Sequence, residues 1–109
     1  MANTFKLKTK ANVGVTTVGI YTAPAATTTV VIGITMANTS GSGVNVGVGI
    51  TRAGTTEDVK LLKNAPIPSG SSLEFMSGNK IVLEATDTVT VDSDTNTSVD
   101  AALTIMEIT

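Results

Sequence analysis

The segment from Thr27 to Arg52 contains two runs in which apolar residues alternate with small or polar ones. It reads Thr27-Thr-Thr-Val-Val-Ile-Gly-Ile-Thr-Met-Ala-Asn-Thr-Ser-Gly-Ser-Gly-Val-Asn-Val-Gly-Val-Gly-Ile-Thr-Arg52. A period of two is typical of a β-strand with one buried face, and a polar, glycine-containing loop between two such strands predicts an antiparallel hairpin. This hairpin is expected to form the core. Its apolar rows are Val30, Ile32, Ile34 and Met36, then Val44, Val46, Val48 and Ile50.

The opposite face of the predicted hairpin carries few side chains, because Gly33, Gly47 and Gly49 lie there. Glycine weakens a strand, since it loses more conformational freedom on folding and has no side chain to pack. One interpretation is the close approach of another backbone, from a second sheet or a neighbouring subunit. The three glycines are therefore candidates for subunit packing. The alternative is a solvent-exposed face on which side chains are not needed.

Turn-forming residues recur about every ten residues along the chain, and no window shows the spacing of an amphipathic helix. A chain of 109 residues is long enough for one domain with a core of its own. We therefore predict an all-β fold, an antiparallel β-sandwich of about eight short strands, of immunoglobulin-like or jelly-roll type. The prediction is a single β-sandwich domain over residues 1–109, with residues 1–10 as an N-terminal strand or arm.

The N-terminal segment predicts a short strand with a charged outer face, because apolar or small residues alternate with lysines there. Its two rows are Phe5, Leu7 and Thr9, and Lys6, Lys8 and Lys10. Every charge before Glu57 is positive and every charge after Lys80 is negative, so a basic end and an acidic end could pair with neighbours. Alternatively, lysines on an edge strand discourage edge-to-edge aggregation. The net charge of −2 and the lack of a basic patch with aromatic residues argue against nucleic-acid binding.

Catalytic and metal-binding patterns are scarce. The chain has no His and no Cys, which excludes Ser-His-Asp triads, Cys-His dyads, disulfides and His or thiolate zinc sites. Oxygen-bearing residues at alternate positions, namely Asp92, Asp94, Asn96, Ser98 and Asp100, partly match a calcium-binding loop. The match fails because Thr97 replaces the required glycine and Leu103 the bidentate glutamate. A polar hairpin loop explains the same residues, so no catalytic, cofactor or metal site is predicted.

The sequence also shows no segment of the kind that directs a chain to a membrane or out of the cell. No run approaches the 18 continuous apolar residues of a membrane helix, and the N-terminus lacks the apolar stretch of a signal peptide. The prediction is a chain made in a cytosolic compartment, with no membrane partner.

Several strand-and-turn phrases from Tyr21 to the C-terminus occur in a recognisable order. They are Tyr21-Thr-Ala-Pro-Ala, Ala37-Asn-Thr-Ser-Gly, Ala65-Pro-Ile-Pro-Ser-Gly-Ser-Ser-Leu, Ile81-Val-Leu-Glu-Ala-Thr-Asp-Thr-Val and the terminal Glu107-Ile-Thr. In this order and spacing the chain resembles small β-sandwich virion structural proteins of tailed bacteriophages, including phages of cyanobacteria. One departure is Thr86, where such a pattern leads us to expect glycine.

The resemblance implies a non-enzymatic protein present in many copies on the virion. The most direct expectation is a capsid decoration (cement) protein, made in the host cytoplasm, that binds the exterior of the shell of major capsid protein and assembles with itself as a homotrimer. It needs no cofactor. The shell contacts are then expected in the N-terminal arm, at Phe5, Lys6, Lys8 and Lys10.

Two other functions remain open on the sequence. One keeps the virion but places the protein in the tail, the baseplate or a fibre attachment. The other is a carbohydrate-binding adhesin, against which stands the scarcity of aromatic residues for stacking on sugars: one Tyr, two Phe and no Trp.

Overall fold

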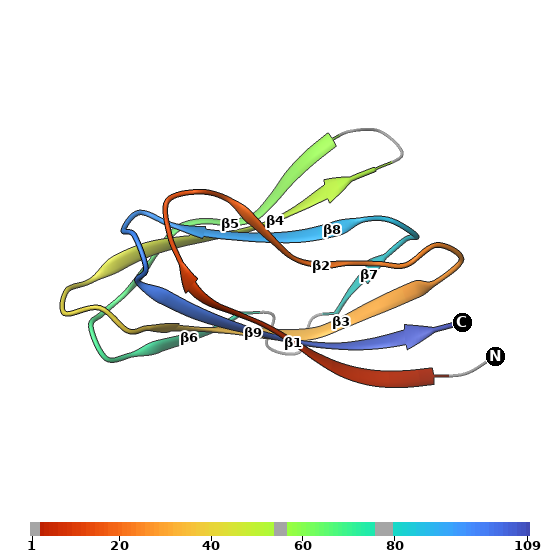
Figure 1. The fold of residues 1–109 in the computed structure, drawn as a ribbon, viewed down its shortest axis with the longest axis horizontal. Helices are drawn as coiled ribbons and strands as arrows, with labels where there is room; N and C mark the ends of the chain where they lie inside the picture. Colours follow the sequence, from red (N-terminus) through yellow and green to blue (C-terminus); the bar gives the residue numbers. More distant parts are fainter. Residues whose placement is uncertain (1–2, 54–56, 76–79) are drawn as a thin grey trace.

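The computed structural model describes residues 3–53, 57–75 and 80–109, which form β-strands joined by turns and loops (Figure 1). They contain no helix of the length and apolarity needed to span a membrane. The strands are β1 (Asn3–Val13), β2 (Val18–Thr22), β3 (Thr28–Asn38), β4 (Val44–Arg52), β5 (Glu57–Ile67), β6 (Ser72–Phe75), β7 (Ile81–Leu83), β8 (Thr88–Ser93) and β9 (Val99–Ile108).

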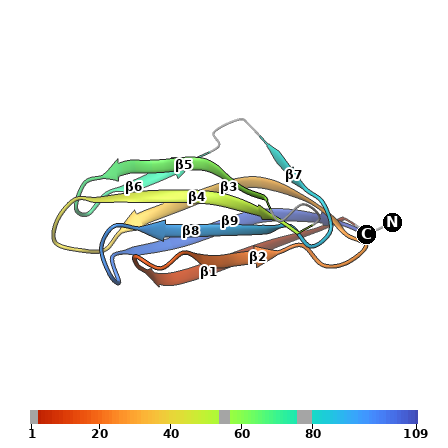
Figure 2. The same ribbon diagram turned by 90° about the horizontal axis from the view of Figure 1, so that it is seen from above.

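Two antiparallel sheets pack face to face (Figures 1 and 2). The first has the order β1-β9-β3-β6, and β7 also pairs with β3; the second has the order β2-β8-β4-β5. The pairings are nested: β4 with β5, β3 with β6 and β7, β2 with β8, and β1 with β9. A long hairpin folded over on itself in this way gives the double Greek key of a jelly roll. The predicted β-sandwich is confirmed, and of its two alternatives the strand order is that of the jelly roll.

The predicted hairpin between the two central strands is wrong, because β3 and β4 lie in different sheets. The loop between them crosses from one sheet to the other instead of reversing within one. Buried Asn38 fixes this crossing: its side-chain nitrogen donates to the Ser42 carbonyl at 2.8 Å and to the Ile67 carbonyl at 2.9 Å. The inner faces of β3 and β4 therefore oppose each other across the core instead of lying side by side.

One of the two apolar rows also differs from the prediction. The register of β3 against β9 shifts between Val31 and Gly33, where a β-bulge lies. A bulge adds one residue to one strand and so exchanges the two faces on either side of it. As a result Val31 is buried, and Val30 and Ile32 are only half-buried. The predicted row on β4 is confirmed, with Val44, Val46, Val48 and Ile50 all buried.

The N-terminal strand faces the opposite way from the prediction. Lys6 pairs with Ile105 and Lys8 with Leu103, both fully buried, so the lysines lie on the side of β1 that faces the sandwich interior. Phe5 lies on the outer side. The reason is the size of the second sheet: its edge strand β2 has five residues against eleven in β1, and leaves most of the inner side of β1 open to water.

The centre of the core provides the first test. Leu103 of β9 is fully buried between the sheets, and Leu103→Ala is expected to lower the free energy of unfolding by about 2–5 kcal/mol, because lost transfer energy and a residual cavity add together. Guanidinium denaturation monitored by circular dichroism measures this. Val15→Ala, at a position that is 56% exposed, should change the value by less than about 0.5 kcal/mol. Equal effects of the two substitutions would contradict the assigned core.

Candidate functional site

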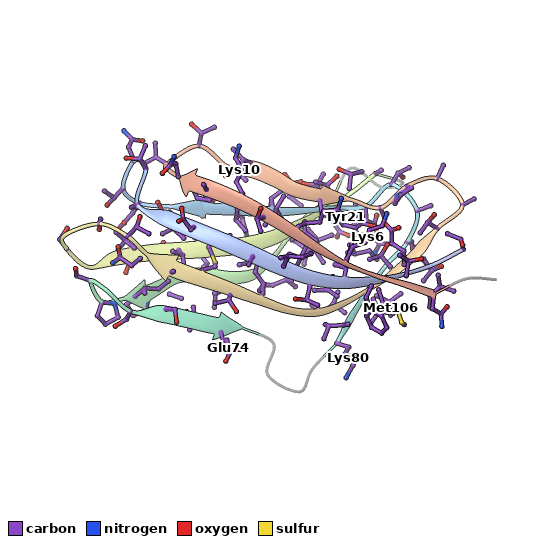
Figure 3. The ribbon with its side chains drawn as sticks, turned by 60° about the horizontal axis from the view of Figure 1, so that its bottom comes forward. Lys6, Lys10, Tyr21, Glu74, Lys80 and Met106 are labelled. Carbon is purple, nitrogen blue, oxygen red and sulfur yellow. The ribbon has the colours of Figure 1, made fainter. Side chains whose placement is uncertain are left out.

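A row of four apolar side chains crosses the outer face of the first sheet. Phe5 of β1 pairs with Met106 of β9, Met106 with Val30 of β3, and Val30 with Val82 of β7. Directly paired residues of antiparallel strands project to the same side, so the four side chains form one continuous line. Its end members are the most exposed, Phe5 at 68% and Val82 at 59%. We call this line the apolar row; Figure 3 shows this sheet from its outer side, with Met106 labelled.

On β1, β9 and β3, the residues next to the apolar row towards the middle of the sheet are uncharged. The next pairs along the sheet join Leu7, which is 65% exposed, to Thr104 and Thr104 to Gly33. A Cβ atom built on Gly33 would meet nothing within 4 Å, so it would extend into open space. The outer face of the second sheet is different, because its β8 positions between the buried ones are Thr88, Thr90 and Asp92. Of the exposed large apolar side chains in the described strands, Phe5, Leu7 and Val82 lie on the first sheet and Val59 on the second.

The row ends at an unpaired strand edge. β1 pairs with β9 on one side and with no described strand on the other. Lys6 forms an ion pair with Glu107, Nζ to Oε1 at 2.9 Å, whereas no described carboxylate lies within ion-pair distance of Lys8 or Lys10. The four residues predicted as shell contacts, Phe5, Lys6, Lys8 and Lys10, therefore share one strand, with the aromatic ring and the ammonium groups on opposite sides.

A buried polar cluster ties the two sheets together at the end where β1 begins and β9 ends. The hydroxyl of Tyr21 in β2 donates to Glu107 Oε2 at 2.6 Å and lies 2.8 Å from Thr29 Oγ1. Figure 3 shows Tyr21 beside Lys6. Burial, together with the bond to Glu107, raises the pKa of Tyr21 to about 12. The hydrogen bond from Tyr21 and the ion pair with Lys6 lower the pKa of Glu107 below its ordinary value.

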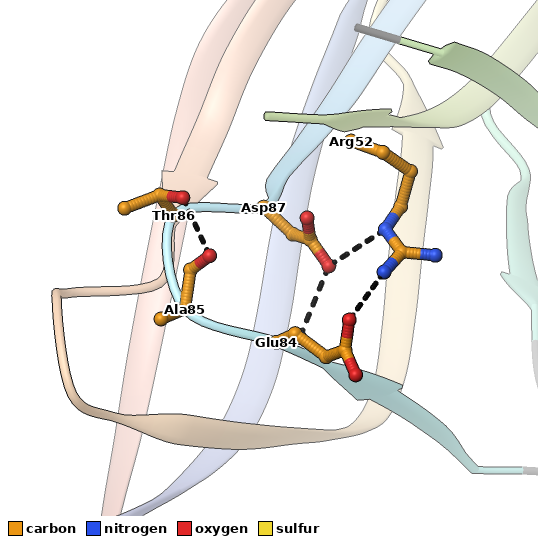
Figure 4. Close-up of polar contacts among 5 residues, drawn as sticks. All are labelled: Arg52, Glu84, Ala85, Thr86 and Asp87. Atoms are coloured by element: carbon orange, nitrogen blue, oxygen red, sulfur yellow. Dashed lines mark hydrogen bonds and ion pairs between the residues drawn. The ribbon is translucent and has the colours of Figure 1, made fainter. Parts of the chain in front are cut away.

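A second cluster holds the turn between β7 and β8 (Figure 4). The buried carboxylate of Asp87 accepts a hydrogen bond from the Glu84 backbone N–H at 3.0 Å and lies 3.0 Å from Arg52 Nε; Arg52 also pairs with Glu84. Thr86 has a φ of 69°, in the left-handed region that favours glycine. Thr86 therefore adopts a strained backbone conformation in this turn, and the ion pairs of Arg52 with Glu84 and Asp87 stabilise the turn.

The carboxylates from Asp92 to Asp100 do not converge on one point. Asp92 accepts from the Thr17 hydroxyl, Asp94 from the Asn45 N–H and Asp100 from the Asn12 N–H. Each carboxylate thus binds a different part of the chain. In residues 3–53, 57–75 and 80–109 no three His, Cys, Asp or Glu side chains are close enough to hold a metal ion.

The three glycines predicted for subunit packing lie in two places. Gly33 is on the outer face of the first sheet, beside the apolar row, whereas Gly47 and Gly49 are buried in the second sheet. A Cβ at Gly47 would lie 2.5 Å from Asp92 Oδ1, and one at Gly49 would lie 2.9 Å from the Val59 carbonyl oxygen. Close approach at these two glycines therefore occurs within the chain. Subunit packing at the glycines stays a prediction.

Sequence reasoning missed three members of the apolar row. Val30 was predicted to be buried, and Val82 and Met106 were not singled out. The signal that could have found them is the pair of adjacent apolar residues at Val30-Val31, Val82-Leu83 and Ile105-Met106. Because successive residues of a strand point to opposite faces, each of these adjacent pairs places one apolar side chain on the outer face.

Comparison with known proteins finds solved structures of similar fold. No protein-family model and no curated protein matches the sequence. The chain is similar to the VP2 protein of infectious bursal disease virus in T=1 particles, with a TM-score of 0.62, 15% identity and 96% of this chain covered. The T13 particle of the same virus gives a TM-score of 0.59, 13% identity and 96% coverage. This chain spans only 31% and 30% of those two chains.

A second kind of structure is similar over most of the length of both chains. Bacillus endospore appendages, described as disulfide-linked pili, give a TM-score of 0.57 with 16% identity, covering 99% of this chain and 87% of that one. At these identities the likeness extends to the fold, which thus occurs both in a virus particle and in a pilus.

The glycines give a clear contrast in stability. Gly49→Ala is expected to lower the free energy of unfolding by about 1–3 kcal/mol, because the new methyl group would press on a backbone oxygen that cannot turn away. Gly33→Ala should be neutral or stabilising by up to about 1 kcal/mol, because its Cβ meets open space and the unfolded chain loses freedom. Chemical denaturation of both variants measures the difference. A reversed order would contradict the placement of the two glycines.

The Tyr21 cluster gives a pH dependence. Tyr21→Phe is expected to lower the free energy of unfolding by about 1.5–3 kcal/mol near neutral pH, because it removes a hydrogen bond to a charged group. The lowered pKa of Glu107 means that its contribution is lost as the pH falls below 4.5; the raised pKa of Tyr21 means that its contribution is lost as the pH rises from 10 through about 12. The difference between wild type and variant should therefore be largest from pH 4.5 to 10. A difference independent of pH over 3–12 would count against the coupling.

Proposed function

We propose that the protein is a virion structural protein that binds the outer surface of a viral capsid as a decoration (cement) protein, without enzymatic activity. The observation that carries the proposal is the apolar row, which ends at the unpaired edge of β1. Exposed apolar surface of this kind mostly marks a contact with another protein. The similarity to a capsid protein in fold, and the sequence resemblance to phage virion proteins, point to the same class of assembly.

The proposed mechanism is stabilisation by linkage. A protein that binds only the assembled shell lowers the free energy of that state by its own binding free energy, and the effect grows with the number of occupied sites. The partner in this proposal is the major capsid protein. The location is the capsid exterior, where β1 and the apolar row face the shell.

The size of the apolar row favours several contacts acting together. A line across four strands spans three gaps of about 4.8 Å, roughly 15 Å in all. A stable interface usually covers about 800 Å² on each partner, more than such a line supplies. A homotrimer would present three rows to the shell at once, and linked contacts bind far more tightly than single ones. We therefore propose a homotrimer on the shell.

The second candidate keeps the virion and places the protein in the tail, the baseplate or a fibre attachment. The observation that favours it is the likeness to a pilus subunit over 99% of this chain, because a domain of this fold and size can build a fibre. Disulfide links are not available to this chain, which has no Cys. A fibre of this protein would have to rely on non-covalent contacts.

Cryo-electron microscopy of the intact particle tests the proposal. Density for this domain at the local three-fold axes of the head, with β1 against the shell, is the expected result. In a sedimentation assay with undecorated particles, Phe5→Asp should weaken binding at least tenfold because it places a charge in the apolar row, and Val15→Asp should leave binding unchanged. Density confined to the tail or fibres would replace the first candidate by the second. Unaltered binding of Phe5→Asp would remove the apolar row from the contact.

A further inference from the structure

One edge of β1 in the first sheet is not paired with any described strand. This strand has eleven residues, from Asn3 to Val13, and is the terminal strand of its sheet. The residues from Asn3 to Leu7 are exposed on both sides of the strand. An unpaired edge presents a row of backbone N–H and C=O groups that can pair with another strand. The length of β1 and its open flanks leave room for one more strand.

The side chains of β1 specify what kind of strand fits. On the outer side, Phe5 is the end member of the apolar row and is 68% exposed. Leu7, which pairs with Thr104 in the neighbouring position, is 65% exposed. On the inner side stand Lys6, Lys8 and Lys10, of which Lys6 alone pairs with a described carboxylate. An added strand would place its own side chains beside these two rows, because directly opposite residues share a face.

A second copy of β1 does not fit this edge. Antiparallel pairing about a two-fold axis through Leu7 would place Lys6 opposite Lys8 of the other copy. Two-fold axes through Lys6, Lys8, Thr9 or Lys10 also set lysines directly opposite each other. An axis through Phe5 sets Lys6 opposite Thr4 instead, but it pairs only the five described residues from Asn3 to Leu7. Like charges directly opposite each other destabilise a strand pair. The lysines therefore disfavour self-pairing and favour a partner of opposite charge.

We propose that the free edge of β1 binds an extended segment of a partner protein in which apolar residues alternate with Asp or Glu. The segment adds a strand to the first sheet, with its carboxylates beside Lys8 and Lys10 and its apolar side chains beside Phe5 and Leu7. Backbone hydrogen bonds supply affinity in such strand addition, and the alternating side chains supply specificity. The proposal deepens the proposed function, on which it rests for the identity of the partner as a shell protein.

The probe is the fluorescently labelled peptide acetyl-Ser-Val-Asp-Val-Glu-Val-Asp-Val-Ser-amide, titrated against the full chain and followed by fluorescence anisotropy. A second peptide carries Lys at the three acidic positions. The wild-type chain is expected to bind the acidic peptide at least tenfold more tightly than the basic one. K8E/K10E should reverse this preference. K60E/K63E, on exposed positions of the edge strand β5, is the matched control and should leave it unchanged.

Two further measurements identify strand addition. In 15N–1H spectra the acidic peptide should shift amide signals of β1 and of its neighbour β9. Two further peptides carry N-methyl groups on alternate nitrogens, one at the odd positions and one at the even positions. One of them should lose binding and the other should keep it, because alternate N–H groups of a strand point to opposite edges.

The outcomes separate the two proposals. Equal binding of both peptides, no binding at 1 mM, equal loss with both N-methylated peptides, or shifts confined to another strand would each overturn strand addition at β1. If the peptide result fails while the domain is seen on the shell, this inference is wrong and the proposed function stands. If the acidic peptide binds as expected and the domain is seen only in the tail, strand addition stands and the decoration role is wrong.

Discussion

The pairing of β9 with both β1 and β3 is the contact on which the rest of the structure depends. β9 lies between these two strands, and its alternate residues Val99, Ala101, Leu103 and Ile105 are almost completely buried against the second sheet. It joins the N-terminal strand to the core, and without it β1 would have no partner. Burial of this inner row is the main favourable contribution to the free energy of folding, since it removes apolar surface of both sheets from water. The register of β9 also decides which side chains reach the outer face, and therefore which surface the protein presents.

The sequence predicts the strands well and their neighbours poorly. Alternation of apolar and polar residues places a strand and divides it into two faces, and this was enough for the β-sandwich and for the buried row on β4. It does not say which strand lies alongside, so β3 and β4 were predicted as a hairpin although the loop after Asn38 crosses between the sheets. Pairing is decided by contacts between residues far apart in the chain.

The candidate surface was predicted only in part, for two reasons. The bulge after Val31 moves Val30 and Ile32 off the inner face, and one inserted residue leaves little trace in a run of apolar residues. The predicted orientation of β1 is reversed because its lysines reach water from the inner side of the sheet and not from the outer side. The inner side of β1 is open to solvent because β2 is short, and this depends on the packing of both sheets. Phe5, Lys6, Lys8 and Lys10 nevertheless lie on one strand, and their role as shell contacts stays a prediction.

The nested strand order has a consequence for how the chain is made. The apolar row takes its four side chains from positions 5, 30, 82 and 106, so it exists only after the last strand has entered the sheet. A chain still on the ribosome has β1 without its partner, because the residues that pair with Phe5 and Lys6 are about a hundred positions further on. Contacts between distant segments form slowly, since closing a long loop costs entropy before any pairing is gained. An unfinished chain therefore cannot present the complete surface, and would not compete with the finished protein for its partner.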